Sequence, residues 1–195
     1  MFHVRSYPKN HERNWADEKR KAPIVNLTVR ARPGKRCEGI LQWGHLAFPC
    51  ALGRGGISAF KREGDGATPL SRMRLLNGYF RKGRIAGLRS SLAMAPIGDR
   101  DGWCDAAGDR NYNRPVSLPY PASHERMLRA DRLYDCCIVL DHNIRPRRRG
   151  MGSAIFFHIA KDGFPPTEGC VAVAPGTMAR LLPRLSRKTI LRVAR

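Results

Sequence analysis

Apolar and polar residues alternate along the first patterned stretch of the chain, residues 24–31. Val25, Leu27 and Val29 fall on one side of an extended chain there, and mostly polar residues fall on the other. Because side chains of a β-strand point alternately to opposite faces, this period predicts a half-buried strand. A Pro-Gly pair at 33–34 then ends it.

Short apolar runs recur along the rest of the chain, separated by clusters of Gly, Pro, Asn and Asp. Runs of this length and spacing are typical of strands in a mainly β domain, not of alternating strands and helices. The runs cover residues 39–43, 46–52, 73–76, 133–140, 154–159 and 189–193. The pattern therefore predicts a β-sandwich or barrel.

One segment near the C-terminus has the spacing of a helix. Thr177, in Pro175-Gly176-Thr177, is a candidate N-cap, and the apolar residues that follow it recur at intervals of one to three residues. These apolar residues are Met178, Leu181, Leu182 and Leu185.

The amino-acid composition predicts a strongly basic surface. The 195 residues include 36 Lys and Arg against 16 Asp and Glu, a formal net charge of +20, and 42% of them are hydrophobic. That apolar share supports one core and excludes a wholly disordered or fibrous chain. The apolar runs are far shorter than the roughly 20 residues of a membrane-spanning helix, and the N-terminus lacks the apolar stretch of a secretory signal.

The same features predict the domain organisation. Residues 1–22 are polar, basic and unpatterned, which indicates a flexible N-terminal arm. Residues 23–195 are predicted to form a single domain. Within it, residues 81–114 are broken repeatedly by glycine and predict a long irregular insertion.

Six cysteines are too sparse in a chain of this length to indicate a disulfide framework. Cys136 and Cys137 are adjacent, so on a strand they face opposite sides and cannot share one metal ion. No C-x-x-C pair occurs. We therefore expect reduced thiols and no metal site.

Candidate chemistry lies around His158 and Cys170. Residues 154–157 are apolar on both alternating faces, which predicts a buried central strand that ends at His158. Gly and Pro residues at 163–166 turn the chain, and Gly169 allows a sharp bend before Cys170. If this loop doubles back, the imidazole can accept the thiol proton and backbone amides can bind an oxyanion, as acyl transfer requires. The alternative is a buried structural histidine and a small core cysteine.

The run that carries this pair, residues 157–173, reads FHIAKDGFPPTEGCVAV and resembles the catalytic signature of the L,D-transpeptidase (YkuD-type) family. That signature is a histidine followed, after a loop, by S/T-x-G-C and a short apolar strand. Residues 64–74 resemble the Thr-Pro element of the same family, and residues 51–57 resemble the strand and turn before it. The resemblance covers residues 48–193.

The resemblance implies roles for five residues. Cys170 would be the nucleophile and His158 its general base, with the imidazole oriented by a backbone carbonyl or a small polar side chain. Gly169, Glu168 and Thr167 would form the oxyanion turn. It also implies a β-rich mixed sheet with one or two short helices, and no metal or organic cofactor. We further expect Cys170 to be the thiol of lowest pKa among the six.

Peptidoglycan stem peptides are the substrate that the resemblance implies, with transfer to an amine or to water. Residues 101–120 are similar to the substrate-side loop of short family members, so Trp103, Tyr112 and Asn113 are predicted to contact substrate. Arg147 is a further candidate, because Glu168 and Ala172 stand where relatives often carry positive charge.

The charge keeps other functions open. A net charge of +20 also suits a nucleic-acid or anionic-polymer binding protein. The basic residues are dispersed, however, and no zinc-finger spacing accompanies them, which disfavours nucleic acid. An inactive family member that binds wall polymer is a third reading. The resemblance implies a periplasmic or cell-envelope location, whereas the absence of a visible signal peptide leaves the cytoplasm open.

Overall fold

The computed structural model describes residues 25–85 and 88–195. The predicted N-terminal arm, residues 1–22, lies outside the described residues. The described part is mainly β, as predicted, with one α-helix and two single-turn 3-10 helices. The strands are β1 (Asn26–Ala31), β2 (Glu38–Trp43), β3 (Leu46–Ala51), β4 (Ile57–Ser58), β5 (Thr68–Pro69), β6 (Arg72–Phe80), β7 (Met94–Pro96), β8 (Asp101–Cys104), β9 (Arg114–Ser117), β10 (His124–Arg126), β11 (Cys136–Leu140), β12 (Phe156–Ile159), β13 (Val171–Val173) and β14 (Ile190–Ala194).

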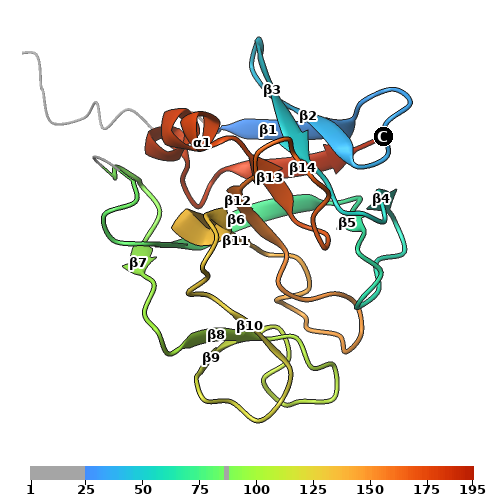
Figure 1. The fold of residues 1–195 in the computed structure, drawn as a ribbon. Coiled ribbons are helices and arrows are strands. Elements are labelled where there is room, and N and C mark those ends of the chain that lie inside the picture. Colours follow the sequence, from blue (N-terminus) through green and yellow to red (C-terminus); the bar gives the residue numbers. More distant parts are fainter. Residues whose placement is uncertain (1–24, 86–87) are drawn as a thin grey trace, which may run out of the picture.

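The main sheet closes on itself (Figure 1). Its strand order is β11-β12-β13-β3-β2-β1-β14-β6-β7, and β6 also pairs with β11, so that eight strands form a barrel-like ring. The pairs β1–β14, β12–β13 and β6–β7 are parallel and the other pairs are antiparallel. The mixed sheet is thus confirmed, and its closure leaves only β7 as an added edge strand.

The barrel interior is filled by the apolar faces of the strands. Leu27, Val29, Leu41, Met73 and Leu75 are all fully buried in this core. Because these residues recur with period two along β1, β2 and β6, the alternation in the sequence follows directly from the inward face of each strand.

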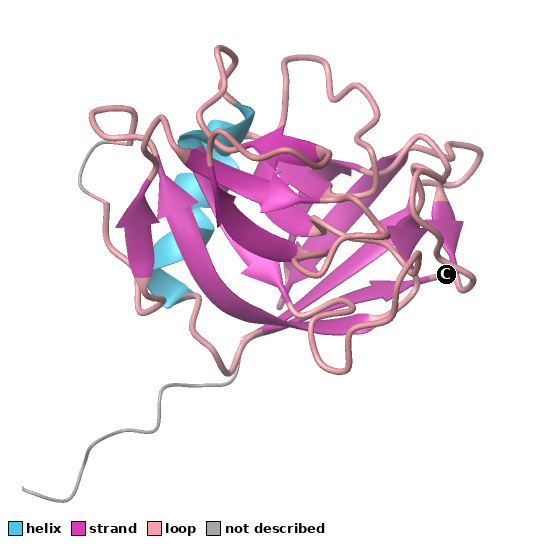
Figure 2. Ribbon diagram, turned by 90° about the horizontal axis from the view of Figure 1, so that it is seen from below, coloured by secondary structure: helices cyan, strands magenta, loops and turns pink. Residues whose placement is uncertain are grey.

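The predicted helix is present as α1 (Pro175–Leu181), followed by the 3-10 helix η2 (Leu182–Arg184). Its N-cap is Ala174 and its first residue is Pro175, so the helix begins three residues before the start predicted with Thr177 as the N-cap. Proline suits the first helical position because its missing N–H would have no partner there. The buried side chains of Met178 and Leu181 join the barrel core, so that the helix packs against the wall of the barrel (Figure 2).

A second, three-stranded sheet, β10-β8-β9, lies beside the barrel (Figure 1). Residues 81–114, expected to be irregular, thus contain two short strands, β7 and β8. Each strand has only three or four residues, which is too short for an alternating pattern to be recognised in the sequence. Trp103 of β8 packs edge-on against Phe156 of β12, with ring centroids 5.2 Å apart. This contact attaches the small sheet to the barrel face that carries His158.

Candidate active site

Two adjacent parallel strands bring His158 and Cys170 to one face of the sheet. In the register of β12 and β13, Phe157 pairs with Val171 and His158 with Ala172. Cys170 stands two residues before Ala172, so both point to the same face as His158. At the rise and spacing of a sheet, Cys170 and His158 are diagonal neighbours roughly 8 Å apart at the backbone. The loop between them doubles back, as the sequence predicts.

The Cys170 thiol is held by the backbone of the segment before β12. Its Sγ donates to the Ala154 carbonyl at 3.2 Å and accepts from the Phe156 amide at 3.3 Å. Ala154 has a φ of 50°, a conformation that few non-glycine residues adopt, and this turns its carbonyl toward the thiol. The thiol is 7% exposed and faces a cavity.

The imidazole of His158 has a fixed tautomer. Nδ1 lies 2.8 Å from the carbonyl oxygen of Ile159, and since a carbonyl only accepts, Nδ1 carries the proton. Nε2 is then the nitrogen that can take a proton. The ring also packs edge-on against Tyr134, with centroids 5.5 Å apart. A backbone carbonyl therefore orients the imidazole.

The turn before Cys170 is closed by the Thr167 side chain. Thr167 Oγ1 donates to the carbonyl of Cys170 at 2.7 Å and accepts from the amide of Gly169 at 3.2 Å. Gly169 has a φ of 129°, and a Cβ there would come within 2.8 Å of the Ala67 carbonyl. Only glycine fits this bend. The Gly169 amide is thus used by the turn itself.

Residues 51–57 and 64–69 form the support beneath this turn. Gly53 bridges to Thr167, and its amide donates to the buried Thr68 Oγ1 at 2.8 Å. A Cβ on Gly53 would lie 2.1 Å from the Gly66 carbonyl. The Thr-Pro element, which the sequence could place only by resemblance, therefore positions the turn before Cys170 through the Thr68 hydroxyl and close backbone contacts.

Both candidate catalytic groups are neutral at pH 7. Burial lowers the pKa of His158 to about 4 and raises the pKa of the Cys170 thiol to about 12. The expectation that Cys170 has the lowest pKa of the six thiols is therefore wrong. Burial disfavours the charged form of each group, and no ion pair between them offsets this cost.

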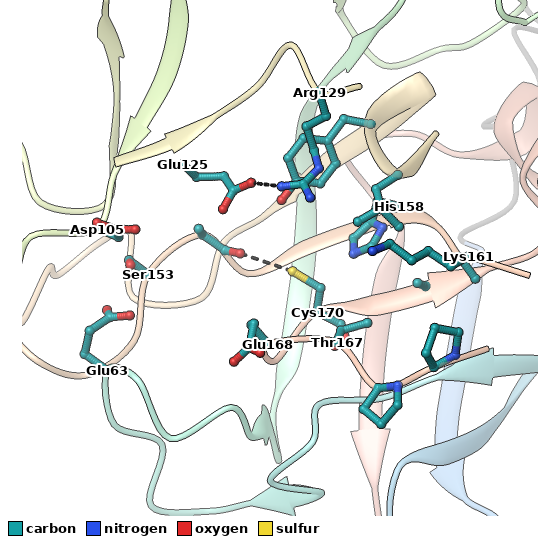
Figure 3. A pocket seen from close by; sticks show the side chains of 17 residues that line it. Glu63, Asp105, Glu125, Arg129, Ser153, His158, Lys161, Thr167, Glu168 and Cys170 are labelled. Atoms are coloured by element: carbon teal, nitrogen blue, oxygen red, sulfur yellow. Dashed lines mark hydrogen bonds and ion pairs between the residues drawn. The ribbon is translucent and has the colours of Figure 1, made fainter. Parts of the chain in front are cut away.

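A cavity of about 400 Å³ opens beside the pair (Figure 3). Cys170, His158, Tyr134 and Ala172 line its floor. Its charged and polar lining residues are Glu63, Asp105, Glu125, Arg129, Ser153, Lys161, Thr167 and Glu168. All five residues of the predicted catalytic pair and turn thus gather at one place, with Glu168 directed outward to an ion pair with Arg54 at 2.8 Å.

The four predicted substrate contacts do not line this cavity. Trp103, Tyr112 and Asn113 are buried in the core, and Arg147 stands in a loop outside this cavity. Asn113 has a supporting position: its Oδ1 accepts from the Ala154 amide at 3.1 Å and from Trp103 Nε1 at 3.0 Å. It thereby holds the segment whose carbonyl binds the thiol.

Several residues of the site carried no recognisable signal in the sequence. Tyr134 packs on His158, and Arg129 lies over the Tyr134 ring at 5.3 Å from its centroid. Arg129 forms ion pairs with Glu125 and with Asp131. These residues come from segments remote from the signature, so only the folded chain brings them to it.

Three further observations concern the described residues as a whole. No group of three or more His, Cys, Asp or Glu side chains in residues 25–85 and 88–195 is arranged to hold a metal ion. No helix in this part of the chain is long and apolar enough to cross a membrane. All six cysteines are free thiols.

A family comparison identifies this arrangement. Residues 41–193 match the sequence model of the L,D-transpeptidase catalytic domain, YkuD. The chain belongs to this family. The match includes both the Cys170 signature and the Thr-Pro element, which form one structural unit here. Among curated proteins, no similar sequence is found.

Two solved structures are similar to this L,D-transpeptidase-family chain. Bdellovibrio bacteriovorus Bd1075 is 14% identical with a TM-score of 0.44, over 91% of this chain and 50% of that one. Mycobacterium tuberculosis L,D-transpeptidase 1 is 12% identical with a TM-score of 0.36, over 87% of this chain and 62% of that one. This chain thus spans less than two thirds of the length of either protein.

Proposed function

We propose that the protein is a cysteine acyltransferase that acts on peptidoglycan stem peptides, by L,D-transpeptidation or L,D-carboxypeptidation. The observation that carries this proposal is the placement of His158 on β12 and of Cys170 directly before the adjacent β13, on one face and at one cavity. The family membership supports the substrate class. Such a substrate also favours a location in the cell envelope.

The first half-reaction forms a thioester. Cys170 Sγ attacks the carbonyl carbon of the residue at stem position three, and His158 Nε2 takes the thiol proton. The amides of Glu168 and Cys170 are the candidate donors to the oxyanion, since the Gly169 amide is bonded to Thr167. Collapse of the intermediate breaks the amide bond, and His158 returns the proton to the departing amine of D-Ala.

The second half-reaction releases the acyl group. An amine from a neighbouring stem attacks the thioester and loses a proton to His158, which passes it to the leaving Cys170 sulfur. The product is a new amide cross-link. Water in place of the amine gives a carboxylic acid, the carboxypeptidase outcome. Because Cys170 and His158 are both neutral at rest, proton transfer accompanies attack instead of preceding it.

Intact-mass spectrometry tests this proposal. Wild-type protein is incubated with a carbapenem and, separately, with a tetrapeptide-stem muropeptide, beside Cys170→Ala, His158→Ala and the control Cys37→Ala. We expect a covalent adduct on wild type and Cys37→Ala, none on Cys170→Ala, and acylation slowed by about 10²- to 10⁴-fold in His158→Ala. An adduct that persists in Cys170→Ala, or no adduct and no muropeptide turnover at all, would overturn the proposal.

A further inference from the structure

A second cavity lies on the barrel apart from the catalytic pair. Its volume is about 590 Å³, and none of its lining residues also lines the active-site cavity. In β11, Cys137 pairs with His158, whereas Leu140, further along the strand, pairs with Leu75 in the lining of the second cavity. The two cavities are thus separate, and the proposed function gives the second one no task.

Arginine dominates the charge of this second cavity. Arg74, Arg145 and Arg187 line it against a single carboxylate, that of Asp141, which leaves an excess of two positive charges. None of these four residues forms an ion pair within the described part of the chain. The Asp141 carboxylate instead accepts a hydrogen bond from the backbone amide of Arg74 at 2.8 Å. Like charges at one cavity repel one another, so a bound anion would stabilise the three guanidinium groups.

Hydrogen bonds hold the backbone that carries each arginine. Arg74 and Asp141 are joined in both directions, because the Asp141 amide also donates to the Arg74 carbonyl, at 3.0 Å. Arg145 lies in a loop that the Asn143 side chain closes. That side chain accepts from the Arg148 amide and donates to the Arg148 carbonyl, both at 2.8 Å.

Arg187 lies in the turn between η2 and β14. In this turn the Thr189 amide donates to the Ser186 carbonyl at 2.9 Å, and the Ser186 amide donates to Thr189 Oγ1 at 3.0 Å. The Thr189 carbonyl in turn accepts from the Leu75 amide of β6 at 3.4 Å. The three arginines therefore come from three remote segments whose backbones are fixed without a ligand, which lowers the entropy cost of binding one.

The barrel wall next to the cavity adds further positive charge. Arg72 is directly opposite Arg192 in the register of β6 and β14, and Arg72, Arg74 and Arg192 are all exposed. The strands β1, β6 and β14 contain no Asp or Glu. Like charges directly across a strand pair are destabilising, so this face also favours the approach of an anion.

We propose that Arg74, Arg145 and Arg187 form a binding site for a phosphomonoester group. A guanidinium group presents its N–H donors as a planar fork that matches the oxygens of phosphate. A phosphomonoester carries a charge of about −1.5 to −2 at pH 7, which balances the excess charge of the lining. A carboxylate or a phosphodiester would leave part of that charge unbalanced. Leu76 and Ile144 line the same cavity and would contact the organic part of the ester.

Calorimetric titration of the full chain with glycerol 3-phosphate, at pH 7 and low salt, tests this site. Wild type is compared with a triple variant that carries Arg74→Gln, Arg145→Gln and Arg187→Gln. We expect the triple variant to bind at least about tenfold more weakly, because three donors of charge-assisted hydrogen bonds are lost. The methyl diester of the same phosphate, a monoanion, should bind wild type more weakly than the monoester does.

A second arm distinguishes a soluble ester from a lipid headgroup. It measures co-sedimentation with phosphatidylcholine vesicles that contain or lack phosphatidic acid, whose headgroup is a phosphomonoester. Binding in either arm that the triple variant loses supports the site, and the arm in which it occurs identifies the source of the phosphate.

The matched control removes three exposed arginines that line neither cavity, through Arg110→Gln, Arg114→Gln and Arg126→Gln. It should keep wild-type binding. All six substituted side chains are exposed, so both triple variants should unfold at about the wild-type temperature. No binding in either arm, equal weakening in the two triple variants, or a diester that binds as tightly as the monoester would overturn the site.

Discussion

His158 and Cys170 are buried to nearly the same degree, at 3% and 7% exposure. Desolvation therefore dominates the pKa of each and favours the uncharged form. Burial also raises the pKa of Cys50 and Cys136 to about 12, so Cys170 is not set apart from the core thiols by acidity. What sets it apart is position: it lines a cavity that His158 also lines, on the same face of the sheet.

The low pKa of His158 predicts a pH-dependent stability. The unfolded imidazole titrates near 6.5 and the folded one near 4, so the unfolded state takes up a proton first as the pH falls. Between pH 7 and pH 4, wild type should therefore lose about 3 kcal/mol more unfolding free energy than His158→Gln. Urea unfolding at several pH values measures this.

The control for this experiment is His45→Gln, because His45 is exposed. It should show the wild-type dependence. His142, whose pKa burial also lowers, is present in all three proteins and contributes equally. Parallel pH profiles for wild type and His158→Gln would contradict the prediction.

The high pKa of Cys170 predicts slow alkylation. At pH 7 its thiol is protonated, whereas Cys37 is the least buried of the six cysteines. Iodoacetamide should therefore label Cys37 at least about tenfold faster than Cys170, as read by mass spectrometry of the peptides. If Cys170 is labelled first near pH 6, the pair is ionised at rest and the neutral-pair mechanism is wrong.

At the scale of elements, the site is a turn supported from below by a second, sequence-distant loop. Gly53 forms a β-bridge with Thr167, and it lies so close to the Gly66 carbonyl and to Gly169 Cα that no side chain fits between them. Thr68 and Thr167 then use their hydroxyls to bond backbone amides of Gly53 and Gly169. The geometry of the turn before Cys170 thus depends on the close backbone packing of two loops and on these two hydroxyls.

Gly53→Ala should consequently disrupt the site. Its Cβ would meet the Gly66 carbonyl at 2.1 Å, so the backbone must shift. We expect a loss of about 2 kcal/mol in unfolding free energy and slower acylation of Cys170. Gly176→Ala, whose Cβ meets no atom within 4 Å, is the matched control and should change stability by less than about 1 kcal/mol. Equal effects of the two substitutions would refute this packing argument.

At the scale of the whole molecule, a basic exterior surrounds an active-site cavity lined by more carboxylates than cations. The two features serve different interactions. Dispersed positive charge attracts polyanions without regard to sequence, since it acts by releasing counterions. In the proposed function, the cavity selects the substrate by local contacts around Cys170.

Binding to random duplex DNA should therefore be weak and strongly dependent on salt. We expect the affinity to fall by about 10³-fold or more between 50 and 200 mM salt, with no change in Cys170→Ala. Acylation by muropeptide should persist at the higher salt concentration. Submicromolar duplex binding that survives 200 mM salt would favour the nucleic-acid function instead.

The sequence by itself determined the strands of the barrel and the residues of the catalytic signature. Period-two alternation reports which face of β1 is buried, because a strand has only two faces. Gly169 before Cys170 indicates a bend whose backbone conformation other residues cannot adopt. Such signals are local, so they can be read along the chain.

The tertiary structure alone decided the closure of the ring, the protonation of the pair and the lining of the cavity. The pairing of β6 with β11 joins strands separated by more than fifty residues. Burial of His158 and Cys170 depends on how Tyr134 and the small sheet cover them. The lining of the active-site cavity combines Glu63, Asp105 and Ser153 from three remote segments. Each of these depends on contacts between distant parts of the chain, which no local pattern encodes.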